Sequence, residues 1–217
     1  MSMPRWPMLG RMDQPQDRPY HHGQLRRALL DAAVEEVQRV GASSVSMREI
    51  ARRAGVSHAG PVHHFGDKAG LFTAIATEGF ELAVETIAPA ARSASAFIDG
   101  GAAYIIFALD HPGHYQVMFR PDLYHPEDPG LVTARNAAFD LLHDSAAESL
   151  PSEPGADAAD LALVGWSLTH GFATLWLTGN LQDRVGSLEE TTHRWLRGLA
   201  LLGAIAQERI TADSTRS

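Results

Sequence analysis

The chain has 217 residues, of which 45% are hydrophobic and 20% charged, a composition typical of a folded globular protein with one or two domains. It contains no cysteine, which excludes disulfides and thiolate metal sites. No apolar run reaches the roughly 18 residues that span a bilayer, and the N-terminal stretch lacks the apolar core of a signal peptide, so we expect a cytoplasmic protein.

The net charge of −8 is unevenly distributed along the chain. Residues 1–80 carry 10 Lys and Arg against 8 Asp and Glu, whereas residues 81–217 carry 8 against 18. Only the first part is electrostatically suited to contact a polyanion such as nucleic acid, and we expect the acidic remainder to face away from it.

The N-terminal region begins with residues 1–19, which contain four prolines and no sustained hydrophobic period. We expect them to form a flexible tail. From Gln24 to Val40, apolar residues recur at three- and four-residue spacing, which predicts an amphipathic helix that ends at Gly41.

A short second helix is expected from Met47, because Ser46 and Glu49 have the spacing of an N-terminal capping box. Gly55 then permits a turn, and Ser57 is suited to cap a third helix. Two short helices joined by a glycine-containing turn and preceded by a supporting helix predict a helix-turn-helix. An ordinary helical hairpin within a bundle is the alternative.

The basic side chains of this unit favour the helix-turn-helix interpretation over the helical hairpin. They lie together on the solvent-exposed side when the apolar stripe faces inward. These are Arg48, Arg52, Arg53, His58, His63 and His64. A fourth helix should follow, capped by Asp67 and carrying Lys68, the only lysine, in its first turn. A cation there opposes the helix dipole, and an external phosphate would compensate for it.

Residues 81–210 show helical patterns separated by Pro- and Gly-containing turns and no convincing strand. The expected spans are Ser95–Asp110, a short piece around His114–Phe119, Leu131–Ser149, Ala158–Thr178 and Leu188–Ile210. We therefore predict an all-α protein of about nine helices. Its parts would be a tail (1–19), a helix-turn-helix DNA-binding domain (20–66), a helical ligand-binding and dimerisation domain (67–210) and a C-terminal tail (211–217).

Aromatic residues are concentrated in this acidic part, and packing of a helical core is the simple explanation for them. The alternative is a cavity for a small apolar or aromatic molecule, since pockets between helices are lined by such side chains. Phe139 and Trp195 are also among the aromatic residues of this acidic part. The predicted ligand-binding residues are Tyr104, Phe107, Tyr115, Phe119, Trp166, His170, Phe172 and Trp176.

The stretch "ADLALVGWSLTHGFATLWLTG" is apolar nearly all round. A helix of this kind is buried on more than one side, which indicates a partner surface as well as an internal core. A two-fold dimer through the last two long helices, with four helices at the interface, is the economical arrangement.

The segment "PYHHGQLRRALLDAAVEEVQRVGASSVSMREIARRAGVSHAGPVHHFGDKAGLF" resembles the N-terminal domain of TetR-family bacterial transcriptional regulators. The order of helix, Gly, capped helix, A-G-V-S turn, recognition helix, F-x-x-K and L-F is similar throughout. Further on, "AYIIFALDHPGHYQVMF" and the W-x-x-x-H-G of Trp166, His170 and Gly171 look like the C-terminal ligand-binding type named the WHG domain.

This resemblance implies a homodimeric regulator, most commonly a repressor, that binds a palindromic DNA operator and releases it when a small ligand occupies the C-terminal pocket. It places base contacts at Arg48, His58, Ala59 and Val62. It places backbone contacts at Ser46, Gly60, His63, His64 and Lys68, with Ser57 in the same DNA-binding surface. Val62 stands where the family usually has Tyr, and Pro61 costs little only in the first turn of the helix.

The sequence leaves three alternatives to a regulator controlled by an apolar ligand. A metal-responsive regulator would use some of the 11 histidines, of which His111 and His114 are close in sequence, although "DHPGH" is more simply a helix end. A repressor without an effector would have a solid interior. An enzyme is disfavoured because "GWSLT" has Thr169 where a nucleophile elbow requires Gly. We therefore expect neither catalysis nor a cofactor, metal site or membrane association.

Overall fold

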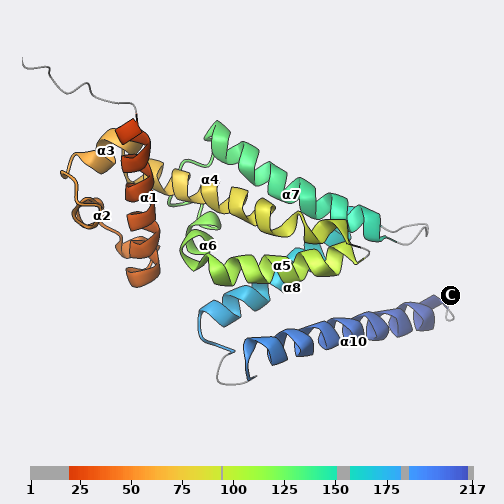
Figure 1. Ribbon diagram of the computed structural model, residues 1–217. Helices are drawn as coiled ribbons and strands as arrows, with labels where there is room; N and C mark the ends of the chain where they lie inside the picture. Colours follow the sequence, from red (N-terminus) through yellow and green to blue (C-terminus); the bar gives the residue numbers. More distant parts are fainter. Residues whose placement is uncertain (1–19, 94, 151–156, 182–185, 215–217) are drawn as a thin grey trace, which may run out of the picture.

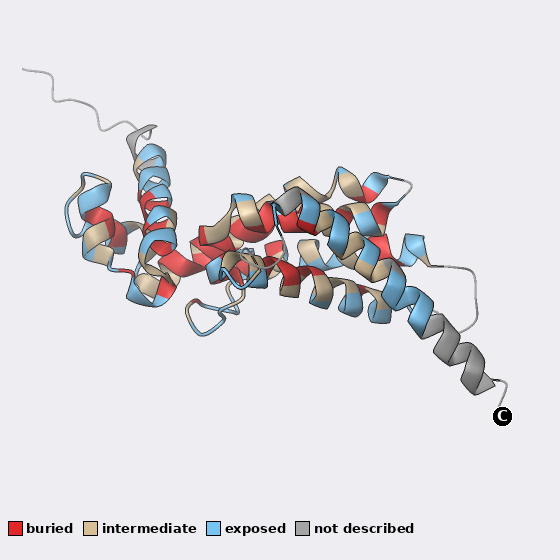
Figure 2. Ribbon diagram, turned by 90° about the horizontal axis from the view of Figure 1, so that it is seen from below, coloured by how far each residue is buried: buried red, intermediate tan, exposed pale blue. Residues whose placement is uncertain are grey.

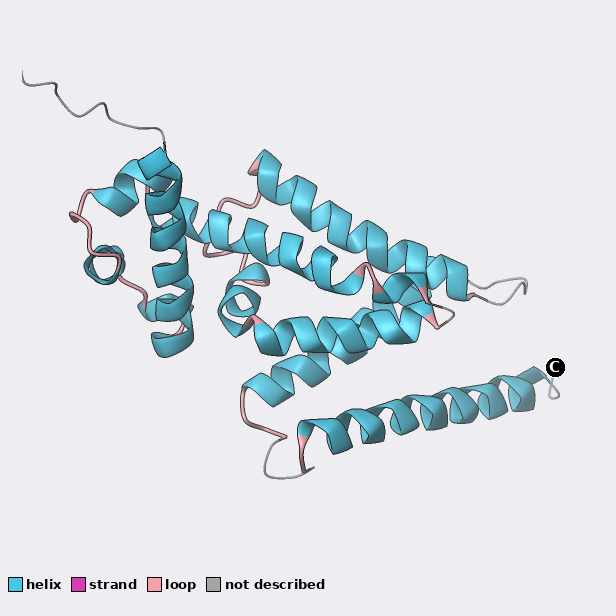
Figure 3. Ribbon diagram, viewed as in Figure 1, coloured by secondary structure: helices cyan, strands magenta, loops and turns pink. Residues whose placement is uncertain are grey.

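The computed structural model describes residues 20–93, 95–150, 157–181 and 186–214, and this part of the chain contains helices and no strands (Figure 3). Two short 3-10 turns, η1 (Ala42–Ser44) and η2 (Ala90–Arg92), accompany the α-helices. The helices are α1 (Tyr20–Val40), α2 (Met47–Arg53), α3 (Gly60–Phe65), α4 (Lys68–Ile87), α5 (Ala96–Asp110), α6 (Pro112–Met118), α7 (Pro129–Ser149), α8 (Ala158–Leu177) and α10 (Leu188–Ser214). The expectation of an all-α protein with about nine helices is confirmed for the described residues.

Helices α1, α2 and α3 form a small unit at one end of the molecule (Figure 1). Gly41, with φ of 78°, ends α1, and Gly55, with φ of 68°, turns the chain between α2 and α3. Both torsions lie in the left-handed region that glycine adopts without strain. Leu29 and Val37 of α1 are fully buried with Ile50 of α2, so the apolar stripe read from the sequence is the core of this unit.

Helix α4 leads from this unit into the larger body, where it packs against α5, α6 and α7 (Figure 1). Helix α8 lies against α5 and α7. Phe72, Phe107 and Leu131, from α4, α5 and α7, have almost no exposed surface and belong to one cluster of buried residues. Figure 2 shows the buried segments in red in both the N-terminal unit and the body. The body is therefore a helical bundle into which α4 is inserted.

Helix α6 is wedged between α1 and α4, and a glycine permits each close approach. A Cβ atom at Gly113 would lie 2.8 Å from the carbonyl oxygen of Val34 in α1. A Cβ atom at Gly79 of α4 would lie 2.7 Å from Sδ of Met118 in α6. Neither position has room for a side chain, so α6 holds the N-terminal unit directly against the body.

A polar cluster joins the same three helices. The guanidinium of Arg27 in α1 pairs with Glu78 of α4 and with Asp31. The other partner of Glu78 is Nε2 of His114 in α6, at 3.0 Å from Oε2. These hydrogen bonds, from His114 first and then Arg27, lower the pKa of Glu78 to about 2. Nδ1 of His114 is buried without a partner among the described residues.

Helix α10 is drawn below the other helices in Figure 1, and its ribbon stands apart from them along its length. Its near end contacts α8 through Trp195, whose ring centroid is 5.9 Å from that of Phe172. Large apolar side chains of α8 and α10 are exposed: Leu163, Val164, Leu175, Leu201, Leu202 and Ile205. The helix continues to Ser214, beyond the expected end at Ile210.

Two further expectations concern the ends of the chain and membranes. The predicted N-terminal tail, residues 1–19, lies outside the described residues. Within the described part of the chain, no helix combines the length and apolar character that a membrane-spanning segment needs.

Candidate functional site

The predicted DNA-binding residues lie together on the N-terminal unit, at the start of α2, in the connection to α3, along α3 and in the first turn of α4. Those with exposed side chains are Ser46, Arg48, Ser57, His58, Ala59, Val62 and His63. Gly60, His64 and Lys68 are half-buried. The structure thus gathers these residues at the end of the molecule farthest from the acidic body (Figure 1).

The third helix begins at Gly60 and has Pro61 in its first turn, where the missing amide costs no hydrogen bond. Pro61 is fully buried and Phe65 is half-buried beneath the guanidinium of Arg26, at 5.1 Å. Val62, which follows Pro61, is 54% exposed. The predicted DNA-contacting residues therefore include one exposed apolar side chain.

Two sequence predictions about helix caps are wrong. The side chain of Ser46 makes no capping hydrogen bond, although Ser46 does occupy the N-cap position of α2. Glu49 instead accepts hydrogen bonds from Arg52, at 2.6 and 2.8 Å, because charge-assisted pairing one turn away competes with a backbone cap. Ser57 does not cap the third helix, whose N-cap is Ala59.

The arginines of α2 differ in their partners. Arg52 pairs with Glu49, and Arg53 pairs with Glu36, with Nε 3.0 Å from Oε2. Glu36 is buried, and hydrogen bonding from Arg39 lowers its pKa. Arg48 is exposed and has no ion pair within the described residues. Its guanidinium alone among the three keeps all its donors available for an external acceptor.

Lys68 is held close to the protein surface. Its Nζ lies 3.3 Å from the carbonyl oxygen of Ser43 and 5.4 Å from the ring centroid of Phe72. Asp67 caps α4 as predicted, accepting a 2.7 Å hydrogen bond from the amide of Gly70, which lowers its pKa. The ammonium group is thus fixed beside the N-terminus of α4, a position suited to a phosphate.

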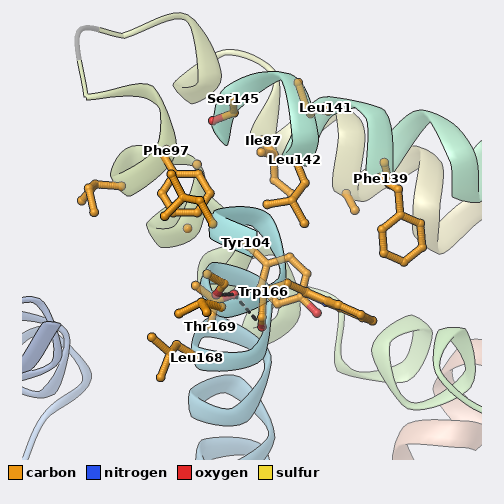
Figure 4. Close-up of a pocket in the computed structure, with 18 of the residues that line it drawn as sticks. Ile87, Phe97, Tyr104, Phe139, Leu141, Leu142, Ser145, Trp166, Leu168 and Thr169 are labelled. Atoms are coloured by element: carbon orange, nitrogen blue, oxygen red, sulfur yellow. Dashed lines mark hydrogen bonds between the residues drawn. The ribbon is translucent and has the colours of Figure 1, made fainter. Parts of the chain in front are cut away.

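A cavity of about 570 Å³ lies inside the body (Figure 4). Residues of α4, α5, α6, α7, α8 and α10 line it, and none of the lining residues is charged. Most of the lining is aliphatic or aromatic, with Tyr104, Ser145 and Thr169 among the few hydroxyl-bearing residues. The volume is in the range that accepts a drug-sized molecule.

The predicted ligand-binding residues fall into three groups. Tyr104, Phe119 and Trp166 line the cavity. Tyr115 and His170 lie behind Tyr104 in a hydrogen-bonded cluster, and Phe107 is fully buried in the core. Phe172 and Trp176 stack on each other, with ring centroids 6.3 Å apart, and are not among the lining residues.

The polar cluster behind the cavity is centred on His170. Its Nδ1 is 2.8 Å from the hydroxyl of Tyr104 and 3.0 Å from that of Tyr115, and Tyr115 is also 2.9 Å from Oγ1 of Thr174. Burial lowers the pKa of His170 and raises the pKa of each tyrosine. Burial thus favours the neutral form of each of these groups, and an unprotonated Nδ1 would accept a hydrogen bond from a tyrosine hydroxyl.

Several lining residues were missed from the sequence. Phe139 and Trp195 belonged to the aromatic gathering but were not assigned to the cavity, whereas Phe97, Leu142 and Leu199 carried no signal beyond being apolar. Among the described residues, no group of three or more His, Asp and Glu is placed to hold a metal ion. His111 and His114 pack edge to face, with ring centroids 5.8 Å apart.

Two family models match the chain. Residues 29–75 match the bacterial regulatory proteins of the tetR family, and residues 97–199 match the tetracyclin repressor-like C-terminal domain. No match was found among curated proteins.

Solved structures share this fold. A protein of unknown function from a Rhodococcus species is 32% identical, with a TM-score of 0.66 over 84% of this chain and 98% of that one. The TetR-family regulator PfmR from Thermus thermophilus is 18% identical, with a TM-score of 0.58 over 77% and 93%. NalD, the secondary repressor of the MexAB-OprM multidrug efflux pump in Pseudomonas aeruginosa, is 19% identical, with a TM-score of 0.56 over 82% and 95%.

Proposed function

The chain belongs to the TetR family of bacterial transcriptional regulators, and from this premise we propose that it is a ligand-responsive repressor. In this proposal it binds a palindromic operator as a homodimer and releases it when an apolar effector occupies the cavity. The observation that carries the proposal is the course of α4. This helix of 20 residues begins at Lys68, in the predicted DNA-binding surface, and lines the cavity with Phe80, Ala83 and Ile87.

The DNA contacts follow from the exposed side chains of α2 and α3. Arg48 has the planar donor geometry that matches O6 and N7 of guanine, a pair that contributes roughly 1 to 3 kcal/mol of discrimination. Val62 presents methyl groups, which suit the methyl group of thymine. Ser46, Gly60, His63, His64 and Lys68 would contact the DNA backbone and fix the register of the N-terminal unit.

The dimer is proposed to form through α8 and α10. The exposed apolar residues of these helices, such as Leu163, Leu201 and Ile205, form a surface of a kind that monomeric proteins rarely leave open. A two-fold axis through this surface would present two N-terminal units to half-sites about 34 to 36 Å apart, or somewhat farther.

Ligand control reduces to a change in the position of the N-terminal units. Helix α4 is about 30 Å long, so a small rotation of its cavity end displaces Lys68 and the adjoining α3. An effector that fits better when the two units are spread shifts the population away from the operator-binding spacing, by no more than its differential affinity. The open cavity favours this mechanism over a repressor without an effector.

Selection of bound fragments from the host's genomic DNA tests the regulator function, because enrichment of a palindromic site is expected. Candidate ligands, suggested by the neighbouring genes, can then be titrated while operator release is followed. Trp166→Ala changes the cavity wall and is expected to alter the ligand response while leaving operator affinity in the absence of ligand unchanged. A protein that prefers no fragment would contradict the regulator function, and an unchanged ligand response would contradict the cavity as the effector site.

A further inference from the structure

Ser145 is a buried polar residue in the wall of the apolar cavity. It lies on α7, is 7% exposed and faces the cavity near Ile87 and Phe97 (Figure 4). Its hydroxyl makes no hydrogen bond with any described residue. Its oxygen is not among the fully buried polar atoms without a partner, so it keeps accessible surface towards the cavity, where a polar group of a ligand can reach it.

Other helical hydroxyls of this protein solve the same problem within their own helix. Thr86 donates to the carbonyl of Leu82 at 2.8 Å, and Thr169 donates to that of Gly165 at 2.9 Å. The carbonyl of Leu141, one turn before Ser145, offers the equivalent acceptor. Ser145 makes no such hydrogen bond, so its hydroxyl remains available within the cavity.

The other two hydroxyl groups of the wall are already engaged. The hydroxyl of Tyr104 bonds to Nδ1 of His170, and that of Thr169 bonds to backbone carbonyls. None of the lining residues carries a charge that could pair with an ionised ligand. Transfer of an unpaired carboxylate or ammonium group into such an environment is strongly unfavourable.

The space beside Ser145 is open because Gly100 of α5 has no side chain. A Cβ atom at Gly100 would lie 3.9 Å from the Ser145 hydroxyl oxygen and 3.7 Å from Ile87. From this end the cavity extends along α5 towards Tyr104 and Trp166. The wall therefore offers one unengaged hydroxyl at its Gly100 end and mostly apolar surface elsewhere.

We propose that the cavity binds an uncharged ligand with a single hydroxyl or carbonyl group, which Ser145 anchors while the apolar body of the ligand extends towards Trp166. The ligand class is thus an alcohol, ketone or ester with a large aromatic or aliphatic body. The inference rests on the proposed effector site, but it concerns binding and can be tested without DNA.

The test measures direct binding of matched probes to the full-length protein by isothermal titration calorimetry. The probes are 2-naphthol, 2-methylnaphthalene and 2-naphthoate, together with decan-1-ol and decanoate. Each neutral alcohol is expected to bind at least about tenfold more tightly than the carboxylate with the same hydrocarbon skeleton: 2-naphthol than 2-naphthoate, and decan-1-ol than decanoate. 2-Naphthol should bind roughly fivefold more tightly than 2-methylnaphthalene, as a single added hydrogen bond predicts.

Ser145→Ala should remove the preference for 2-naphthol over 2-methylnaphthalene and leave the affinity for 2-methylnaphthalene unchanged. Ser149→Ala is the matched control, because Ser149 lies one turn further along α7 and is exposed. Since the Ser145 hydroxyl has no protein partner, Ser145→Ala should not lower the melting temperature of the ligand-free protein.

Three outcomes would overturn the proposal: a preference for the carboxylates, an alcohol preference that survives Ser145→Ala, or no binding of any probe. Operator release is measured separately on a selected fragment. Selective binding of the alcohols without operator release would leave the ligand class standing and contradict the proposed effector function.

Discussion

Arginine side chains that look equivalent in the sequence have different roles in the structure. Arg52 and Arg53 are tied to Glu49 and Glu36, so their charges are largely compensated within the protein. Arg48 is exposed and has no ion pair within the described residues. Base reading by α2 should therefore depend on Arg48, since compensated guanidinium groups have fewer free donors for DNA.

Lys68→Ala is expected to weaken binding to every DNA sequence about equally, because an ammonium group at a phosphate carries no sequence information. The slope of log K against log salt concentration should fall by about 0.9 for each protomer. Fluorescence anisotropy with operator and unrelated DNA at several salt concentrations measures both quantities.

Arg92→Ala is the control, since Arg92 is an exposed cation of η2 on the body. This substitution should leave the slope unchanged. A changed preference among DNA sequences at constant slope would show that Lys68 does not contact phosphate.

Glu78 makes stability depend on pH in the acid range. Its pKa is lowered to about 2, first by the hydrogen bond from His114 and then by Arg27, so its contribution is complete above the ordinary value of 4.5. That contribution is lost as the pH falls from 4.5 towards 2. Glu78→Gln should lower the free energy of unfolding by about 1.5 to 3 kcal/mol at pH 7.

Urea denaturation as a function of pH measures this effect, and the difference between Glu78→Gln and the parent protein should shrink below pH 4.5. Glu85→Gln, at an exposed site on the same helix, should differ little from the parent at any pH. A constant difference down to about pH 2 would mean that the carboxylate of Glu78 is not the stabilising group.

At the scale of elements, α6 packs closely on α1 and α4 at two glycines, Gly113 and Gly79. Gly113→Ala would place a Cβ atom 2.8 Å from a backbone oxygen of α1, which cannot move aside as a flexible side chain can. The expected cost is about 1 to 3 kcal/mol of unfolding free energy, together with reduced operator affinity as α1 shifts.

Gly23→Ala provides the comparison, because nothing lies within 4 Å of the new Cβ atom. Its helical site in α1 should make this substitution stabilising by up to about 1 kcal/mol. If both substitutions gave the same change in urea denaturation, the close packing of α6 on α1 would not be a source of stability.

The helices themselves were predictable from the sequence because apolar spacing and glycine stops are local signals. Gly41 and Gly55 correctly indicated where α1 and α2 end. The predicted capping box at Ser46 is absent because Glu49 pairs with Arg52 and Arg53 instead. Arg53 also pairs with Glu36 of α1. Local spacing carries no information about such competition.

The cavity was only partly predictable. Aromatic residues indicated an apolar interior, and Tyr104, Phe119 and Trp166 do line the cavity. Phe107 and Phe172 are aromatic residues of the same region, but they pack away from the cavity. The orientation of each helix decides which of its side chains face the cavity. Ser145 gave no sequence signal, since a buried serine and an exposed one read alike.

At the scale of the whole molecule, the basic N-terminal unit lies at the Lys68 end of α4, and the acidic body packs around the rest of this helix. This separation allows a protein with a net charge of −8 to approach DNA by one end only. Dimerisation through the body would bring two such ends to the same side, which suits binding to a palindrome.

Leu201→Glu combined with Ile205→Glu should prevent this dimerisation, because both side chains are more than 60% exposed and carboxylates cannot be buried there without partners. Sedimentation analysis should show a monomer, and operator affinity should fall about a hundredfold as the advantage of two linked contacts is lost. Thr133→Glu with Asn136→Glu, on the exposed side of α7, adds the same charge and should preserve the dimer. A dimer that survives the α10 substitutions would require a different interface.

Leu202 of α10 lines the cavity and is also 55% exposed, next to Leu201 on the proposed partner-facing helix. If one helix serves both purposes, self-association and guest binding are thermodynamically linked, and each must change the equilibrium constant of the other by the same factor. The apparent affinity for a guest molecule would then vary with dilution of the protein. Titrations at nanomolar and micromolar concentrations would differ, and the sense of that difference reveals whether occupancy tightens or loosens the pair.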